Sequence, residues 1–128
     1  HHLVERESEV LYDEATMIAD RCSKAYEGKT INLDSAYPQI EAVSAYLQSD
    51  IWILNHEGTI VADSSDSRTG IAIDDFDPTA QGNRLYSIGQ YYNLFDSKVL
   101  SVSAPITGNM KTYGYIVIHM PIQNIEDF

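Results

Sequence analysis

Apolar residues recur every seven positions along the first 26 residues, a stretch that contains neither glycine nor proline. This spacing is typical of one long helix, which we predict over residues 3–26, with Gly28 ending it. The apolar stripe suits either a seam between two parallel helices or packing against a sheet. Its rows are Val4, Leu11, Ile18 and Ala25, then the smaller Ser8, Ala15 and Cys22, with Leu3, Val10 and Met17 widening it.

After this helix the pattern gives a shorter helix and then changes its period. Pro38 opens a second predicted helix over residues 38–48, where apolar residues keep helical spacing. From Ile51 onward, apolar residues alternate with polar ones or form short runs, as they do in strands. We predict five strands, over residues 51–55, 59–63, 86–92, 99–106 and 112–120.

A polar, irregular stretch over residues 64–84 separates the second predicted strand from the third, and Pro78 excludes a central strand there. Short turns join the other neighbouring strands, which makes these pairs antiparallel. Two helices followed by a run of antiparallel strands predict an α+β fold. We therefore expect a five-stranded antiparallel sheet with both helices packed on one face.

The last two predicted strands each have one apolar face and one face that carries hydroxyl and other polar groups. Side chains alternate between the two faces of a strand, so Ser101 and Ser103 share the mixed face of the fourth strand. Tyr115 and His119 share the mixed face of the fifth. The apolar faces should pack on the helices, and the mixed faces should turn toward the long polar loop.

Composition narrows the class of protein. The 128 residues include 8 Lys plus Arg against 19 Asp plus Glu, a formal charge of −11. Nucleic-acid binding depends on clusters of basic residues, so we expect no nucleic-acid partner. No apolar run approaches the ~18 residues of a membrane span. We assign residues 3–128 to one domain of a longer protein and interpret His1 and His2 as the remnant of a tag.

Three segments, in order along the chain, carry a family pattern. Residues 3–26 form the predicted long helix, at the position where the family named below has a helix that continues from a transmembrane helix. Residues 51–64 (IWILNHEGTIVADS) match a strand, a D-x-x-G turn and a returning strand, with Asn55 where the family commonly has Asp; residues 99–106 and 114–118 match the closing hairpin. On these segments the chain resembles the PAS-like sensor domains called PDC or single Cache domains, found in bacterial membrane histidine kinases and chemoreceptors.

The resemblance implies a PAS-like fold at the extracytoplasmic face of the plasma membrane, with transmembrane helices flanking the domain in the parent protein. It implies the sensor domain of a two-component histidine kinase, or alternatively of a chemoreceptor, that binds a small polar ligand and signals through those helices. In such a receptor two copies emerge side by side, so we also expect a homodimer, with the stripe on the first helix as its seam.

The family places its ligand pocket between the sheet and the long loop, where the mixed faces of the last strands would line it. Arg84 is the expected partner of a ligand carboxylate, because a guanidinium binds it bidentately. The clustered basic residues of members that bind multiply charged acids are missing here, which favours an amino acid or a neutral metabolite. The predicted ligand-binding residues are Arg84, Tyr86, Ser101, Ser103, Tyr115 and His119.

No nucleophile, base or phosphate-binding motif can be assembled from the sequence, so we expect a domain without catalytic residues, enzyme activity or cofactor. Cys22 lies on the apolar stripe, which predicts a buried structural thiol. The acidic residues of the 63–77 segment fit no calcium-loop spacing, and we assign no metal site. The alternative to a ligand sensor is a ligand-free interaction module that responds to a partner protein or to divalent cations.

Overall fold

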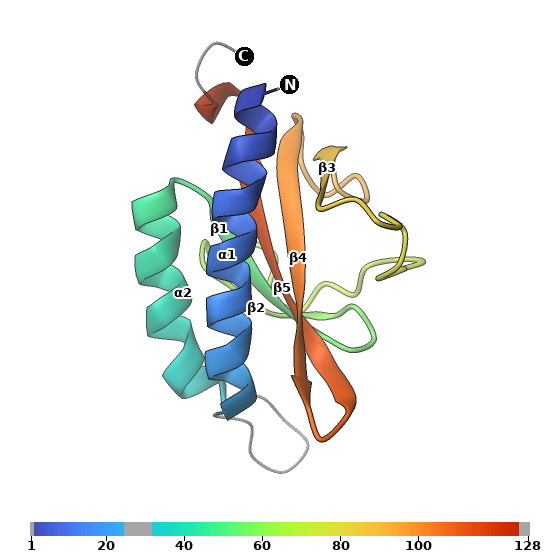
Figure 1. The fold of residues 1–128 in the computed structure, drawn as a ribbon. Helices are drawn as coiled ribbons and strands as arrows, with labels where there is room; N and C mark the ends of the chain where they lie inside the picture. Colours follow the sequence, from blue (N-terminus) through green and yellow to red (C-terminus); the bar gives the residue numbers. More distant parts are fainter. Residues whose placement is uncertain (1, 25–31, 126–128) are drawn as a thin grey trace.

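Within residues 2–24 and 32–125, which the computed structural model describes, the chain forms two α-helices, five strands and one short 3₁₀ helix (Figure 1). The predicted end of the first helix, with Ala25 and Gly28, lies outside the described residues. The elements are α1 (His2–Lys24), α2 (Leu33–Leu47), β1 (Asp50–Asn55), β2 (Ile60–Asp63), β3 (Tyr86–Gly89), β4 (Val99–Gly108), β5 (Lys111–Pro121) and η1 (Ile122–Asn124).

The strands form one antiparallel sheet in the order β2-β1-β5-β4-β3. Both helices cover one face, and the long segment between β2 and β3 lies on the other side (Figure 1). The predicted α+β class, with five antiparallel strands and two helices on one face, is therefore confirmed. Gly114 allows β5 to approach β1 closely, because a Cβ at this position would lie 2.1 Å from the Leu54 carbonyl oxygen.

The apolar stripe on α1 forms the main core with the apolar faces of β4 and β5. Leu11, Ala15 and Ile18 are essentially inaccessible to solvent, and Ser8 and Cys22 are buried with them. The stripe therefore packs on the sheet, which was the alternative use of this pattern. The prediction that this stripe is a seam between two copies is wrong for the described positions, because those side chains are already buried within one chain.

Two predicted boundaries differ from the structure by more than two residues, and each has a local reason. The second helix begins at Leu33 rather than at residue 38, because the Asn32 side chain caps it by accepting a hydrogen bond from the Ser35 backbone N–H at 3.2 Å. The third strand ends at Gly89 rather than at residue 92, because the residues that follow turn away from the extended conformation.

A second, smaller core lies on the loop side of the sheet. It consists of buried apolar residues from β1, β2, β5 and the loop, with partly buried aromatic side chains packed around them. Gly58 has φ +92°, and a Cβ there would lie 2.6 Å from the Phe76 side chain, so only glycine fits the contact. The buried members of this cluster are Trp52, Leu54, Ile60, Ile73 and Val117.

Candidate functional site

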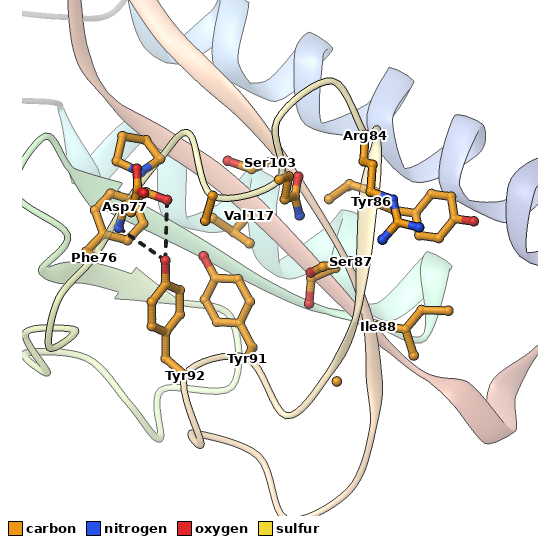
Figure 2. A pocket seen from close by; sticks show the side chains of 16 residues that line it. Phe76, Asp77, Arg84, Tyr86, Ser87, Ile88, Tyr91, Tyr92, Ser103 and Val117 are labelled. Carbon is orange, nitrogen blue, oxygen red and sulfur yellow. Dashed lines mark hydrogen bonds between the residues drawn. The ribbon is translucent and has the colours of Figure 1, made fainter.

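A cavity of about 390 Å³ lies between the loop side of the sheet and the polypeptide that crosses it (Figure 2). β3, β4 and β5 form its floor, where Ser103 and Val117 lie at the centre of the view. The segments on either side of β3 supply its walls. A concave site of this volume, with apolar walls and a few polar groups, is typical of a small-molecule pocket.

Aromatic side chains form one wall of the cavity. Tyr91 and Tyr92 meet edge to face with ring centroids 5.0 Å apart, and Phe76 lies 6.1 Å from Tyr92. The backbone N–H of Asp77 donates to the Tyr92 hydroxyl at 3.1 Å, which ties this wall to the other loop segment (Figure 2). The wall is thus fixed by contacts between two segments far apart in sequence.

Several hydroxyl groups at the cavity have no hydrogen-bond partner among the described residues. They include the hydroxyls of Ser87, Ser103 and Tyr91, all of which belong to lining residues. Burial, followed by the nearby Tyr92, raises the pKa of Tyr91 above the ordinary phenol value, so its hydroxyl stays a neutral donor. A ligand with polar groups would satisfy these hydroxyls.

One acidic and one basic side chain also line the cavity, at opposite ends of the view in Figure 2. The Asp77 carboxylate accepts hydrogen bonds from the backbone N–H of Thr79 at 2.9 Å and from its hydroxyl at 2.7 Å. These bonds hold the pKa of Asp77 below its usual range. Arg84 is exposed. The rim therefore offers an anionic and a cationic contact for a ligand.

Four of the six predicted site residues meet at this cavity: Arg84, Tyr86, Ser101 and Ser103. Tyr115 instead packs against Phe76, with ring centroids 5.6 Å apart. His119 is fully buried, and its Nδ1 lies 2.7 Å from the Ser101 hydroxyl. Burial, then the charge of Arg68, lowers the pKa of His119 to about 3, so the ring is neutral. Tyr115 and His119 lie on the predicted face but not at the cavity.

The aromatic wall and Asp77 were not among the predicted site residues. Tyr91 and Tyr92 were assigned to a strand, and the adjacent pair of large aromatic residues beside a polar segment was the signal that could have marked them. Phe76 and Asp77 lie in an irregular loop, whose path cannot be derived from residue periodicity. Their place at the cavity depends on contacts that only the folded chain makes.

The alternative of a cation site in the acidic segment finds little support in the geometry. Asp74, Asp75 and Asp77 are exposed, whereas Asp63 is buried and accepts hydrogen bonds from Ser65 and from the backbone. Within residues 2–24 and 32–125, no group of three or more His, Cys, Asp or Glu side chains is placed to hold a metal ion. Across the same ranges, no helix combines the length and apolar character needed to cross a bilayer.

Comparison by sequence finds no matching family model and no similar curated protein. Comparison by structure finds sensor domains. The sensor domain of the histidine kinase DctB from V. cholerae is 16% identical with a TM-score of 0.53, over 73% of this chain and 39% of that chain. The ligand-binding domain of the Campylobacter jejuni chemoreceptor Tlp3, crystallised with L-norvaline, is 12% identical with a TM-score of 0.58, over 98% of this chain and 58% of that one.

The Tlp3 sensory domain with bound isoleucine gives a similar match, with 12% identity and a TM-score of 0.56, over 98% of this chain and 59% of that one. The chain therefore spans roughly two-fifths of the DctB domain and three-fifths of the Tlp3 domain. At these identities the likeness establishes the fold, which agrees with the sequence resemblance. The chain has the PDC/Cache-like fold of bacterial sensor domains.

Proposed function

We propose that this domain is the extracytoplasmic sensor of a bacterial membrane receptor and that it binds a small polar molecule in the cavity between the sheet and the segments that flank β3, residues 76–84 and 91–92. The observation that carries the proposal is the set of unpartnered hydroxyls at the cavity, on Ser87, Ser103 and Tyr91. These hydroxyls line the cavity and make no hydrogen bond within the described residues, so they are free to bind the polar groups of a small ligand.

An amino acid or a small neutral metabolite is the ligand class that the lining favours. The cavity offers one carboxylate, Asp77, for an amine, and one guanidinium, Arg84, for a carboxylate. Aromatic walls suit an apolar side chain or an ammonium group. The binding of isoleucine and L-norvaline by the structurally similar Tlp3 domain supports this class.

The parent protein that best fits the fold is a two-component sensor histidine kinase, with a chemoreceptor as the second candidate. Sensor domains of both kinds share this fold, as DctB and Tlp3 illustrate. In either parent, transmembrane helices would flank the domain, and ligand binding would be transmitted through them. The domain itself contributes binding rather than catalysis in this proposal.

Homodimerisation in the intact receptor would use a face of α1 other than the buried stripe. Val10 and Met17 lie seven residues apart and are 48% and 50% exposed. Seven-residue spacing aligns side chains along one side of a helix, and a second copy held in the same membrane would meet this side at high effective concentration. In the full-length receptor, Val10→Cys should crosslink between copies, whereas Ser8→Cys should not, because Ser8 is buried.

A thermal-shift screen tests ligand binding directly. The purified domain is incubated with a panel of amino acids, neutral polar metabolites and dicarboxylates, and a binder should raise the melting temperature. Ser103→Leu, which places a larger side chain at the cavity floor, should abolish the rise, while Thr107→Leu at an exposed position on the same strand should keep it. Arg84→Ala should remove the rise for carboxylate ligands without changing the fold, because Arg84 is exposed.

The ligand-free module is the competing function, and the same screen separates the two. If no member of the panel shifts the melting temperature of the wild-type domain, the interaction module is favoured. If a compound shifts the wild-type domain and Ser103→Leu equally, the ligand binds elsewhere and the proposed site is wrong.

A further inference from the structure

Two carboxylates share a buried site where β1 begins and β2 ends. Asp63 is inaccessible to solvent, and the Asp50 side chain is 17% exposed. The two carboxyl groups lie within hydrogen-bond reach of each other. Asp63 Oδ1 accepts from the backbone N–H and the hydroxyl of Ser65, both at 2.9 Å, and its Oδ2 accepts from the Arg68 backbone N–H at 2.9 Å.

Asp50 has a different set of partners. Its Oδ2 accepts a hydrogen bond from the Trp52 indole Nε1–H at 2.9 Å, and its Oδ1 accepts from the Ser64 hydroxyl at 3.0 Å. The Arg68 guanidinium lies 3.7 Å from the same Oδ2. Among the described residues, Arg68 is the only cation within ion-pair distance of either carboxylate. The guanidinium therefore pairs with Asp50, while Asp63 receives only the backbone N–H of Arg68.

This arrangement favours one bound proton. Two carboxylates in contact repel each other when both are ionised, and one of them then holds its proton to higher pH. Burial, then the hydrogen bond and the charge of Asp63, raises the pKa of Asp50 to about 6. Burial alone would also raise the pKa of Asp63, but hydrogen bonds from Asp50, Ser65 and the Arg68 backbone outweigh it and hold that pKa below the ordinary value.

Two titratable groups near the pair, His119 and Tyr37, stay neutral near pH 6. His119 on β5 lies opposite Asp50 in the strand register, and its lowered pKa of about 3 keeps it uncharged. On α2, burial and then the charges of Asp66, Glu41 and Asp63 raise the pKa of Tyr37, so its phenol keeps its proton. The change of charge between pH 7 and pH 5 in this cluster is therefore expected at Asp50.

The partners of Asp50 also hold the 90–96 loop against the sheet. The Arg68 guanidinium lies 4.3 Å from the Phe95 ring centroid, and its Nε–H donates to the Leu94 carbonyl at 3.0 Å. Trp52 stacks on Phe95 with centroids 5.4 Å apart and meets the Tyr91 ring at 5.6 Å. Asp50 thus contacts both side chains, Arg68 and Trp52, on which this loop rests.

The loop held in this way is strained. Three consecutive residues, Tyr91, Tyr92 and Asn93, have φ of 43°, 53° and 60°. The left-handed region is unfavourable for residues other than glycine, so packing must hold the segment in place. A loss of the Asp50 charge beside Arg68 would act on a segment that is already under strain.

We propose that the Asp50–Asp63 pair is a proton-binding switch: in mildly acidic surroundings it takes up one proton at Asp50, which removes the charge paired with Arg68 and loosens the hold of Arg68 and Trp52 on the 90–96 loop. The domain would then respond to acidification as well as to a ligand. The switch rests on the cluster itself and does not require the cavity to bind a molecule.

The single tryptophan of the chain is a built-in reporter, because Trp52 donates its indole N–H to Asp50. In ¹⁵N-labelled protein the indole N–H resonance should shift between pH 7.5 and pH 4.5, with one midpoint near pH 6. In Asp50→Asn this transition should be lost. Asp74→Asn, which alters an exposed carboxylate, and His56→Gln, which removes an exposed histidine, should both keep it.

The proposal is overturned if the indole resonance of the wild-type domain stays constant over this range, or if Asp50→Asn retains the same transition. Should Asp50→Asn fail to fold, the carboxyl ¹³C resonances of the wild-type protein give the answer without a variant. One aspartate of the pair should titrate near pH 6 and the other below the ordinary value of about 3.9. Two ordinary titrations below pH 4.5 would contradict the switch.

Discussion

The Ser101 hydroxyl and the Nδ1 atom of His119 lie 2.7 Å apart, across the register pair that joins β4 to β5. His119 is fully buried beside the rings of Trp52, Tyr91 and Phe95, and its Nε2 has no partner among the described residues. Within the described residues, the one hydrogen bond of this imidazole is therefore the bond between Nδ1 and the Ser101 hydroxyl. It places a polar pair in the middle of the loop-side core.

Removal of this bond should destabilise the domain. In Ser101→Ala the buried imidazole keeps no hydrogen bond at either nitrogen, and a buried polar group without a partner costs about 1–3 kcal/mol. Ser103→Ala is the matched control two residues away, and its effect should stay within about 0.5 kcal/mol because its hydroxyl has no partner to lose. Urea unfolding of both variants measures the difference, and equal losses would show that the Ser101 bond adds nothing.

The two sides of α1 should differ sharply in mutational cost. Leu11→Ala leaves a cavity in the main core and should lower the free energy of unfolding by about 2–5 kcal/mol. Val10→Ala, next in sequence but 48% exposed, should change it by no more than about 0.5 kcal/mol. A small loss for Leu11→Ala in denaturant unfolding would contradict the assignment of the stripe to the core.

Gly114 should tolerate no side chain. Gly114→Ala forces a Cβ to within 2.1 Å of the Leu54 carbonyl oxygen, so the β1–β5 pair must separate locally. The expected loss of stability is about 1–3 kcal/mol, the usual cost of overpacking. Gly70→Ala meets no atom within 4 Å and carries only the strain of its positive φ, so it should cost less in the same unfolding assay. The reverse order of the two variants would be evidence against the β1–β5 register.

Two buried groups should oppose each other in the pH dependence of stability. The pKa of His119 falls from 6.5 to about 3 on folding, so the unfolded state binds more protons between these values and stability declines on acidification. The pKa of Asp50 rises from 3.8 to about 6, so the folded state binds the extra proton and stability increases as pH falls from 6 toward 4.

Asp50→Asn removes the stabilisation that proton uptake by Asp50 gives the folded state on acidification. The variant should therefore lose stability more steeply than the wild type between pH 6 and pH 4, as measured by denaturant unfolding at a series of pH values. A parallel pair of stability curves would mean that Asp50 takes up no extra proton on folding.

Periodicity and strand alternation predicted the sheet, the helix-covered face and the mixed face, because these depend on which side of an element is apolar. The same rule placed Tyr115 and His119 at the pocket, since alternation assigns a face but not a position along the sheet. The apolar stripe that contains Leu11 did not distinguish a seam between two helices from packing on the sheet, because both require the same apolar side of the helix. The positions of Tyr91, Tyr92 and the other loop residues at the cavity are set by left-handed backbone turns and by tertiary contacts. Neither leaves a periodic pattern in the sequence from which it could be predicted.

The central claim is that a small molecule binds in the cavity between the sheet and the segments that flank β3, residues 76–84 and 91–92. Backbone amide chemical-shift mapping tests it most directly, with the strongest binder from the panel added to ¹⁵N-labelled protein. We expect the largest shifts over residues 84–92 and at Ser101 and Ser103, with saturation at the ligand concentration that raises the melting temperature. Shifts confined to α1 and α2, or no shift from any amino acid or neutral metabolite of the panel, would contradict the claim.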